Sequence, residues 1–143
     1  MNTKEQTFLE EAQACYDNRS SSWSEIMDRL EAAHSADDEE TEHDLGQELN
    51  EELLSVRQMT HGMVDQGDTW ELLLSTGGPA SRVVVTVDED GEPTAAVFEF
   101  QDWGMPWTPA PEQDGDLLTR WATTVAGFYC EHCNAEAASR WAQ

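Results

Sequence analysis

The chain has 143 residues, and its 30 Asp and Glu against 7 Lys and Arg give a formal net charge of −23. This length fits one ordinary domain, and a charge of this sign repels phosphate backbones and anionic lipids, so neither nucleic acid nor a membrane is expected as a direct ligand. Hydrophobic residues still make up 38% of the chain and include 6 Trp, which argues against disorder throughout and predicts one packed core.

The N-terminal end and the cysteines indicate the compartment. The opening segment, MNTKEQTFLEEAQ, lacks the apolar stretch of a signal peptide, and no later run approaches the ~20 apolar residues that span a bilayer. The 3 Cys are an odd number without a secretory signal, which disfavours a framework of structural disulfides. We therefore expect a cytoplasmic protein.

Three helices are predicted in the N-terminal half of the chain. Apolar residues recur at helical spacing within Lys4–Tyr16, and the capping-box pattern of Ser22–Glu25 begins a second helical stretch that reaches Ala33. The segment Ser35–Asp44 contains 6 acids and is expected to be a solvated linker or the acidic start of the next helix. The helical spacing of Leu, Val and Met side chains then predicts a third helix over Leu45–Met63.

The period of the apolar residues then changes to that of strands. The segments Trp70–Ser75, Arg82–Val87 and Ala95–Asp102 are rich in β-branched and aromatic residues, and short turns with Gly and Pro separate them. Short connections between successive strands predict a three-stranded antiparallel β-meander. Alternate residues from Ala96 to Phe100 are expected to share one face of the third strand.

The C-terminal part is expected to return to helix. Regular structure should stop at the proline-rich segment after Trp103, because proline cannot donate a backbone hydrogen bond, and apolar spacing predicts a last helix over Leu117–Phe128. The predicted fold is α+β, with N-terminal helices, a three-stranded antiparallel β-meander and a C-terminal helix. Residues 1–68 are expected to form an acidic helical region and residues 69–143 the sheet with the last helix, together in one compact domain.

The most distinctive feature is a run of acids without a base. Between Arg29 and Arg57 the chain contains 10 acids and no Lys or Arg. A duplex carries one phosphate per ~1.7 Å of axis, and a helix that rises ~1.5 Å per residue can carry carboxylates at a comparable density. These acids predict a phosphate mimic that occupies a nucleic-acid channel. The candidate partner-binding residues are Glu31, Asp37, Asp38, Glu39, Glu40, Glu42, Asp44, Glu48, Glu51 and Glu52.

Two simpler explanations of the acidic run stay open. A solvated acidic face would only keep the protein soluble. Adaptation to a salt-rich cytoplasm would also favour many acids and few lysines, and Lys4 is the only lysine in the chain. The clustering of the acids and the 6 retained Trp argue against salt adaptation.

No catalytic machinery is recognisable, so the chain is not expected to be an enzyme. Cys130, His132 and Cys133 resemble half of a zinc site, but no second pair of ligands at a matching spacing accompanies them. They are weak metal candidates, and no cofactor is expected. Gly77 and Gly78 lack the Gly-Lys-Ser/Thr sequence of a phosphate loop and are expected to form a turn between two strands.

The stretch WELLLSTGGPASRVVVTVDEDGEP, followed by FEFQDWGMPWT, resembles a family of small uncharacterised proteins of bacteriophages and prophages over residues 69 to about 108. The resemblance rests on the TGGPA turn, the hairpin and the QDWG-type motif followed by PWT, and it implies no established reaction. We expect its motif residues to join the sheet to the proline-rich segment after Trp103, which we call the proline loop. Trp103 and Trp107 would contribute apolar area, and Arg82 and Asp102 would form an ion pair. The motif residues are Thr76, Gly77, Gly78, Pro79, Arg82, Gln101, Asp102, Trp103, Gly104, Pro106 and Trp107.

The resemblance implies a phage origin, which favours the mimic, because phages often encode small acidic proteins that block DNA-binding defences. The first hypothesis is a phage-encoded inhibitor of the anti-CRISPR, DNA-mimic type. It would bind the basic nucleic-acid-binding surface of a CRISPR effector complex, or of another host defence protein, in the cytoplasm of the bacterial host. The alternative is a structural or regulatory phage protein that binds another protein through its sheet and proline loop, with incidental acidity. A metal-dependent enzyme that uses the C-terminal cysteines ranks last.

Overall fold

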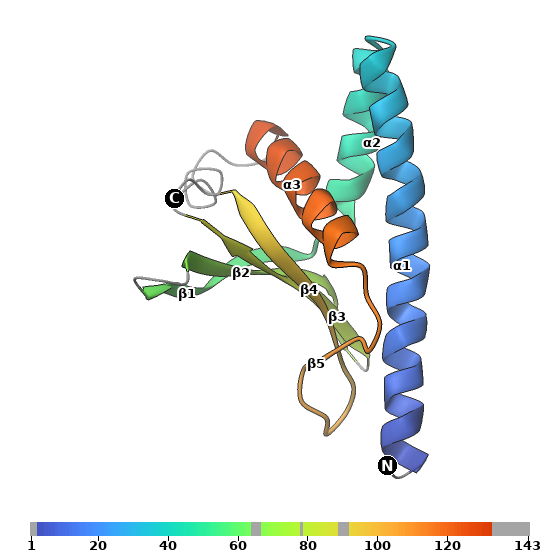
Figure 1. The fold of residues 1–143 in the computed structure, drawn as a ribbon, viewed down its shortest axis with the longest axis vertical. Helices are drawn as coiled ribbons and strands as arrows, with labels where there is room; N and C mark the ends of the chain where they lie inside the picture. The colour runs from blue at the N-terminus through green and yellow to red at the C-terminus, as the bar shows by residue number, and fades with distance from the viewer. Residues whose placement is uncertain (1–2, 64–66, 78, 89–91, 133–143) are drawn as a thin grey trace.

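The structure, a computed structural model, describes residues 3–63, 67–77, 79–88 and 92–132. Its elements follow the order α1, α2, β1, β2, β3, β4, β5 and α3, and the five strands form one antiparallel sheet. Helices α1 and α3 pack against this sheet, and α2 lies beside α1 (Figure 1). The α+β class is confirmed, whereas the expected count of three strands is wrong.

A single helix, α1 (Thr3–Ser35), replaces the two helices expected at the N-terminus. Its buried side chains from Phe8 to Ala33 keep one helical phase along its length, and neither Gly nor Pro interrupts them. Ser22, expected to cap a second helix, is an exposed residue in the interior of α1. The 33 residues of α1 give a helix about 50 Å long.

The second helix, α2 (Glu39–Glu51), begins within the acidic segment Ser35–Asp44. Of the two structures expected for this segment, the acidic start of a helix is therefore confirmed. Leu45 and Leu49 of α2 are buried in the core, and α2 packs along α1 to form a helical hairpin.

The helix expected over Leu45–Met63 is wrong in its second half, where the chain forms strand β1 (Ser55–Met63). The backbone N–H of Leu54 donates to the carbonyl of Leu73 at 2.8 Å and directs the chain into the sheet. β1 then pairs antiparallel with β2 (Gly67–Ser75). Pairing outweighs the helical spacing of the apolar residues, because an open edge of β2 would leave backbone groups without partners.

The three strands expected from the sequence are confirmed as β2, β3 (Ala80–Val87) and β4 (Pro93–Gln101). The sheet has the order β1-β2-β3-β4-β5, so each strand pairs with the next along the chain. β5 (Thr108–Pro109) lies in the segment that was expected to have no regular structure. Proline is accepted there because β5 is an edge strand, where one row of backbone groups needs no partner.

One face of the sheet packs on the helices. The rings of Phe98 and Phe100 contact Tyr16 and Phe8 of α1, with 5.5 Å between centroids in both pairs. Ala96, Phe98 and Phe100 are all buried, which confirms their expected common face. The next residues along the strands alternate to the opposite face, which carries the charged side chains described below.

The last helix, α3 (Gly115–His132), confirms the expected C-terminal helix with longer bounds. Its Trp121 stacks on Trp23 of α1, with 4.1 Å between ring centroids and an interplanar angle of 16°, and both side chains are fully buried. One cluster of buried residues contains side chains from all three helices and from the sheet. The helical and sheet parts of the chain therefore share a core. Among the described helices, none is long and apolar enough to cross a membrane.

Candidate protein-interaction surface

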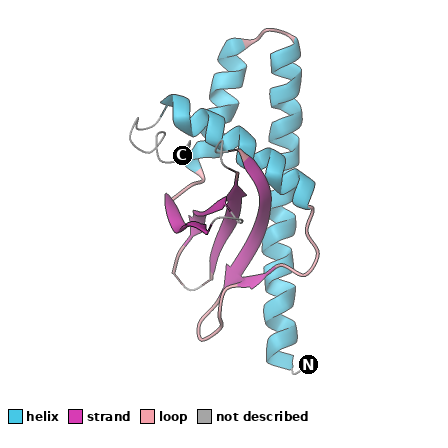
Figure 2. Ribbon diagram, turned by 60° about the vertical axis from the view of Figure 1, so that its left-hand side comes forward, coloured by secondary structure: helices cyan, strands magenta, loops and turns pink. Residues whose placement is uncertain are grey.

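The candidate acids lie mostly on a helical hairpin that projects from the body of the molecule. We call this element the acidic hairpin and define it as α2, the turn before it and α1 from Glu25 onward. In Figures 1 and 2, the end of the hairpin where α1 meets α2 extends beyond the sheet and α3. The tip of the hairpin carries Asp37, Asp38, Glu39 and Glu40 in succession. The acids are therefore gathered on an accessible element.

Most of the ten candidate acids have no partner in the described part of the chain. Seven of them are exposed, and their side chains form no hydrogen bond or ion pair with the described residues. Their charges are not compensated within this part of the molecule and can face external cations. These seven are Glu31, Asp37, Glu39, Glu40, Asp44, Glu48 and Glu51.

Asp37 occupies a position that local stability disfavours. It follows the last turn of α1 in the left-handed conformation, with φ of 55°. The N–H groups of Asp37 and Asp38 donate to the carbonyls of His34 at 3.1 Å and Ala33 at 2.9 Å, which is the pattern of a Schellman motif. Glycine is the usual residue at this position, because a side chain strains the left-handed conformation. The Asp37 side chain therefore lowers the stability of this helix end.

Asp38 caps the N-terminus of α2. Its carboxylate accepts hydrogen bonds from the hydroxyl of Thr41 at 2.6 Å and from the backbone N–H of Thr41 at 3.2 Å. These hydrogen bonds, that from the side chain of Thr41 first, hold the pKa of the Asp38 carboxyl below its ordinary value. The cap fixes where α2 begins and so defines the shape of the tip.

Glu42 and Glu52 are partly buried and make internal contacts. A carboxylate oxygen of Glu42 lies 2.8 Å from the Nδ1 atom of His34. Glu52 accepts a hydrogen bond from the indole Nε1 of Trp23 at 2.6 Å and forms an ion pair with Arg19 at 3.4 Å. Glu52 thus supplies an acceptor to a buried tryptophan, which gives it a structural role that the sequence did not indicate.

Glu40, Asp44 and Glu48 form a row along the exposed side of α2. Successive members are four residues apart, which places them about 6 Å apart along the helix axis. Phosphates along one strand of a duplex are separated by about 3.4 Å of axis, so the row corresponds to roughly every second phosphate. Like charges at this spacing weaken a helix by a few tenths of a kcal/mol per pair. The acids of the tip and of α1 add to this row.

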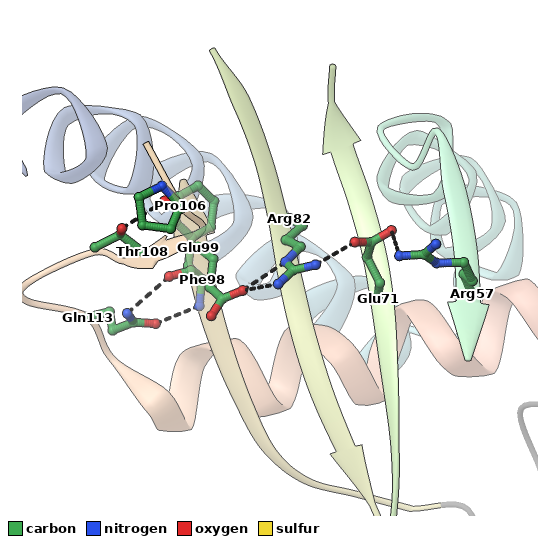
Figure 3. Close-up of polar contacts among 8 residues, drawn as sticks. All are labelled: Arg57, Glu71, Arg82, Phe98, Glu99, Pro106, Thr108 and Gln113. Atoms are coloured by element: carbon green, nitrogen blue, oxygen red, sulfur yellow. Dashed lines mark hydrogen bonds and ion pairs between the residues drawn. The ribbon is translucent and has the colours of Figure 1, made fainter. Parts of the chain in front are cut away.

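The motif residue Arg82 lies at the centre of a ladder of ion pairs across four strands, shown in Figure 3. Its guanidinium lies 2.7 Å from Glu71 and 2.7 Å from Glu99, and Glu71 lies 3.4 Å from Arg57. Arg82 and Glu71 are both buried, and the two positive and two negative charges balance. The expected pairing of Arg82 with Asp102 is wrong, because Glu71 and Glu99 lie nearer on the neighbouring strands.

Trp107 and Trp103 have opposite environments. The ring of Trp107 covers the guanidinium of Arg82, with 4.3 Å between the Arg82 Cζ atom and the ring centroid. This contact joins the proline loop to the sheet, as expected. Trp103 is 81% exposed, so its expected packing role is wrong. Its side chain is therefore accessible to a partner.

The remaining motif residues form the backbone frame of the sheet. Gly77 has a φ of 98° in the connection between β2 and β3, which fits the turn expected there, and Pro79 is exposed beside it. Gln101 is partly buried at the end of β4. Gly78 lies outside the described residues. Gln113 accepts a hydrogen bond from the Phe98 N–H at 2.7 Å through its Oε1 atom and donates one from its Nε2 atom to the Phe98 carbonyl at 3.2 Å, and these bonds secure the loop against β4 (Figure 3).

No protein-family model, curated protein or solved structure matches the chain. The resemblance to bacteriophage proteins therefore stays a hypothesis that rests on the motif residues.

The metal candidates lie largely beyond the described side chains. The backbones of Cys130 and His132 belong to α3, but their side chains lie outside the described part of the molecule, as does Cys133. In the described part, no group of three or more His, Cys, Asp or Glu side chains is placed to hold a metal ion.

Sequence reasoning missed the ion-pair ladder and the role of Glu52. A signal for the ladder was present, because Glu71 and Glu99 each interrupt an apolar strand, and an isolated charge at such a position needs a partner on the neighbouring strand. The sequence does not reveal Arg57 as a partner, because the apolar spacing of its segment predicts a helix. Nothing local marks Glu52 as the acceptor for Trp23, since the two residues are 29 positions apart.

Proposed function

We propose that this protein binds a basic, nucleic-acid-binding protein through the acidic hairpin and thereby competes with nucleic acid. The observation that carries the proposal is the set of seven exposed acids on a projecting hairpin, without partners in the described part of the chain. The resemblance to phage proteins makes a CRISPR effector complex of a bacterial host the first target to test. In this proposal the protein inhibits by occupation and catalyses no reaction.

The placement of the acids supports binding over general solubility. Acids that only increase solubility could lie anywhere on the surface and would avoid positions that destabilise the fold. Asp37 instead has a left-handed backbone at a position that favours glycine, and the like charges of Asp44 and Glu48 repel each other along α2. Residues that break local rules without a structural gain are expected mainly at functional sites.

Long-range attraction follows from the net charge of −23. Such a field can raise the association rate with a basic partner by roughly 10 to 1,000-fold at low salt. Exposed charges are screened over about 10 Å at 0.1 M salt. Binding by this mechanism should therefore weaken severalfold or more between about 50 and 200 mM salt.

The test compares two triple variants with the same net charge. The tip variant is Asp37→Asn, Glu39→Gln and Glu40→Gln. The control variant neutralises three exposed acids away from the tip, Glu10→Gln, Glu92→Gln and Glu112→Gln. Each variant changes the net charge from −23 to −20, because three acids are lost. Asp38, Glu42 and Glu52 are left intact because they make internal contacts.

The measurement is binding to a purified, guide-loaded CRISPR effector complex, with and without target DNA as competitor. We expect the tip variant to bind at least tenfold more weakly and the control variant to bind within twofold of the original protein. Both variants should melt within a few degrees of the original. Binding that ignores salt and target DNA would reject the electrostatic mechanism, and absence of binding would reject this target class.

The second candidate is a contact through the sheet and the proline loop, with incidental acidity. The observation in its favour is Trp103, whose 81% exposure is unusual for so large an apolar side chain. If Trp103→Ala abolishes binding to the effector complex while the tip variant binds normally, this second candidate is right and the proposed function is wrong.

A further inference from the structure

The turn that carries Trp103 is closed by two hydrogen bonds. The N–H of Met105 donates to the carbonyl of Asp102 at 2.9 Å, and Gly104 has a φ of 76°, which is the geometry of a type II turn with Trp103 at its second position. The carboxylate of Asp102 accepts from the backbone N–H of Trp103 at 2.8 Å. Pro106 follows and restricts the chain further. The exposed indole is thus carried by a hydrogen-bonded turn.

A notch of about 490 Å³ separates this turn from the first turns of α1. Figures 1 and 2 both show the loop between β4 and β5 beside the N-terminal part of α1. Phe8 and Met105 supply apolar surface to the notch, and Phe8 is buried against Phe100. Asp102 and Trp103 line one side and Glu11 the other. The notch therefore combines an aromatic ring, an apolar floor and two carboxylates.

The same combination holds an arginine elsewhere in this molecule. Arg82 lies against the ring of Trp107 at 4.3 Å while its guanidinium contacts Glu71 and Glu99 at 2.7 Å. An indole face attracts a guanidinium electrostatically, and carboxylates accept its N–H groups in a planar, paired geometry. The Trp103 notch offers the same kinds of groups, and no arginine is among the described residues that line it.

We propose that the Trp103 notch binds an arginine side chain of the basic partner, as a second contact separate from the acidic hairpin. The guanidinium would stack on Trp103 and pair with Asp102 and Glu11, while the aliphatic stem would lie on Phe8 and Met105. Arginine fits better than lysine because its planar group can stack and donate two parallel hydrogen bonds. The inference rests on the proposed function only for the basic nature of the partner.

Lys4 and the N-terminus of α1 are the local features that oppose a cation. Lys4 lines the notch but forms no ion pair with the described residues, so it occupies neither the Asp102 nor the Glu11 carboxylate directly. The helix N-terminus contributes about half a positive charge. The positive charges of Lys4 and of the helix N-terminus are offset by the two carboxylates, by the stacking on the indole and by the net charge of −23.

The probe is a capped Gly-Arg-Gly peptide, compared with the same peptide containing citrulline, which keeps the shape of arginine without its charge. Binding is followed by NMR through the indole N–H signal of Trp103, assigned by its loss in Trp103→Ala. We expect a saturable shift of this signal with the arginine peptide and at least a fivefold weaker affinity with citrulline. Asp102→Asn and Glu11→Gln should each weaken the arginine peptide about threefold or more.

The tip variant serves as the control that separates this inference from the proposed function. It should bind the arginine peptide as the original protein does, because Asp37, Glu39 and Glu40 are not among the residues of the notch. Equal affinity for arginine and citrulline, or shifts that persist unchanged in both carboxylate variants, would overturn the inference. If the tip variant loses effector binding but the arginine peptide causes no specific shift in the original protein, the proposed function stands. Only the arginine site in the notch is then rejected.

Discussion

The sharpest stability prediction concerns Asp37, the residue with a left-handed backbone at the end of α1. A side chain with a Cβ costs roughly 1–2 kcal/mol in this conformation, with Asp at the lower end because its polar side chain tolerates it. Replacement by glycine removes that cost but increases the entropy lost on folding by about 0.5–1 kcal/mol. Removing the charge itself changes the free energy little, because Asp37 lies between the C-terminus of α1 and the N-terminus of α2, whose dipoles act on it with opposite sign.

Together these effects predict that Asp37→Gly raises the free energy of unfolding by about 0.5 kcal/mol, which corresponds to roughly 1–2 °C in melting temperature for a chain of this length. Asp37→Asn removes the charge but keeps a side chain that tolerates the conformation, so the free energy of unfolding should stay within a few tenths of a kcal/mol of the original. Asp37→Ala keeps the strain without that tolerance and should give no gain.

The assay is thermal and urea unfolding followed by circular dichroism at low salt. Glu48→Gln is the matched control, since Glu48 is an exposed acid within α2 and should change stability by only a few tenths of a kcal/mol. The expected order of stability places Gly above Asn and the original Asp, which should be close to each other, with Ala no higher than Asp. A glycine variant that melts at or below the original protein, or an alanine variant that gains as much as glycine, would refute the reasoning.

Three further predictions concern the internal contacts. Glu52→Ala should lower the free energy of unfolding by about 1–3 kcal/mol, because it leaves the buried Trp23 indole N–H without an acceptor, whereas Glu52→Gln should cost less in the same urea titration. Arg82→Ala should cost about 3–5 kcal/mol, because it leaves buried carboxylates without their cation, and urea unfolding would measure it. The hydrogen bonds that lower the pKa of Asp38 give stability that is present above about pH 4 and lost as the pH falls through the lowered pKa. Asp38→Asn, which does not titrate, should therefore gain stability relative to the original protein between pH 5 and pH 2, as measured by melting temperature.

A large part of the fold could be predicted from local patterns. β2, β3 and β4 are rich in β-branched and aromatic residues between turn signals, and α3 shows a clear helical spacing. The preference of each of these elements for strand or helix is set by residues that are close together in the sequence. The buried face from Ala96 to Phe100 followed from alternation, because successive side chains of a strand point to opposite faces.

The errors arose where a local signal was outweighed by a partner far along the chain. The capping pattern at Ser22 had no effect, because the apolar stripe of α1 continues in phase against the rest of the core. The helical spacing through Met63 gave way to β1 because β2 offered a strand edge to pair with. Neither competing partner can be recognised within a window of neighbouring residues.

In the candidate site too, some features could be predicted from the sequence and others depend on tertiary contacts. Exposure of most of the acidic segment Ser35–Asp44 was predictable, because this segment contains almost no apolar residue that could bury it. The internal use of Asp38 followed from its place before a helix, once the start of α2 was known. The use of Glu52 by Trp23, and the separation of Trp103 from Trp107, depend on which elements meet in space.

The sequence by itself determined the α+β fold class of this protein, its acidity and the base-free run, because composition and the local period of apolar residues are properties of the chain alone. Only the tertiary structure decided that the run projects as a hairpin, that Arg82 is neutralised by Glu71 and Glu99, and that Trp103 stands exposed beside Glu11. The physical reason is that compensation of a charge and burial of a ring depend on distances of a few ångströms between residues far apart in sequence, and those distances are set by packing of the whole core.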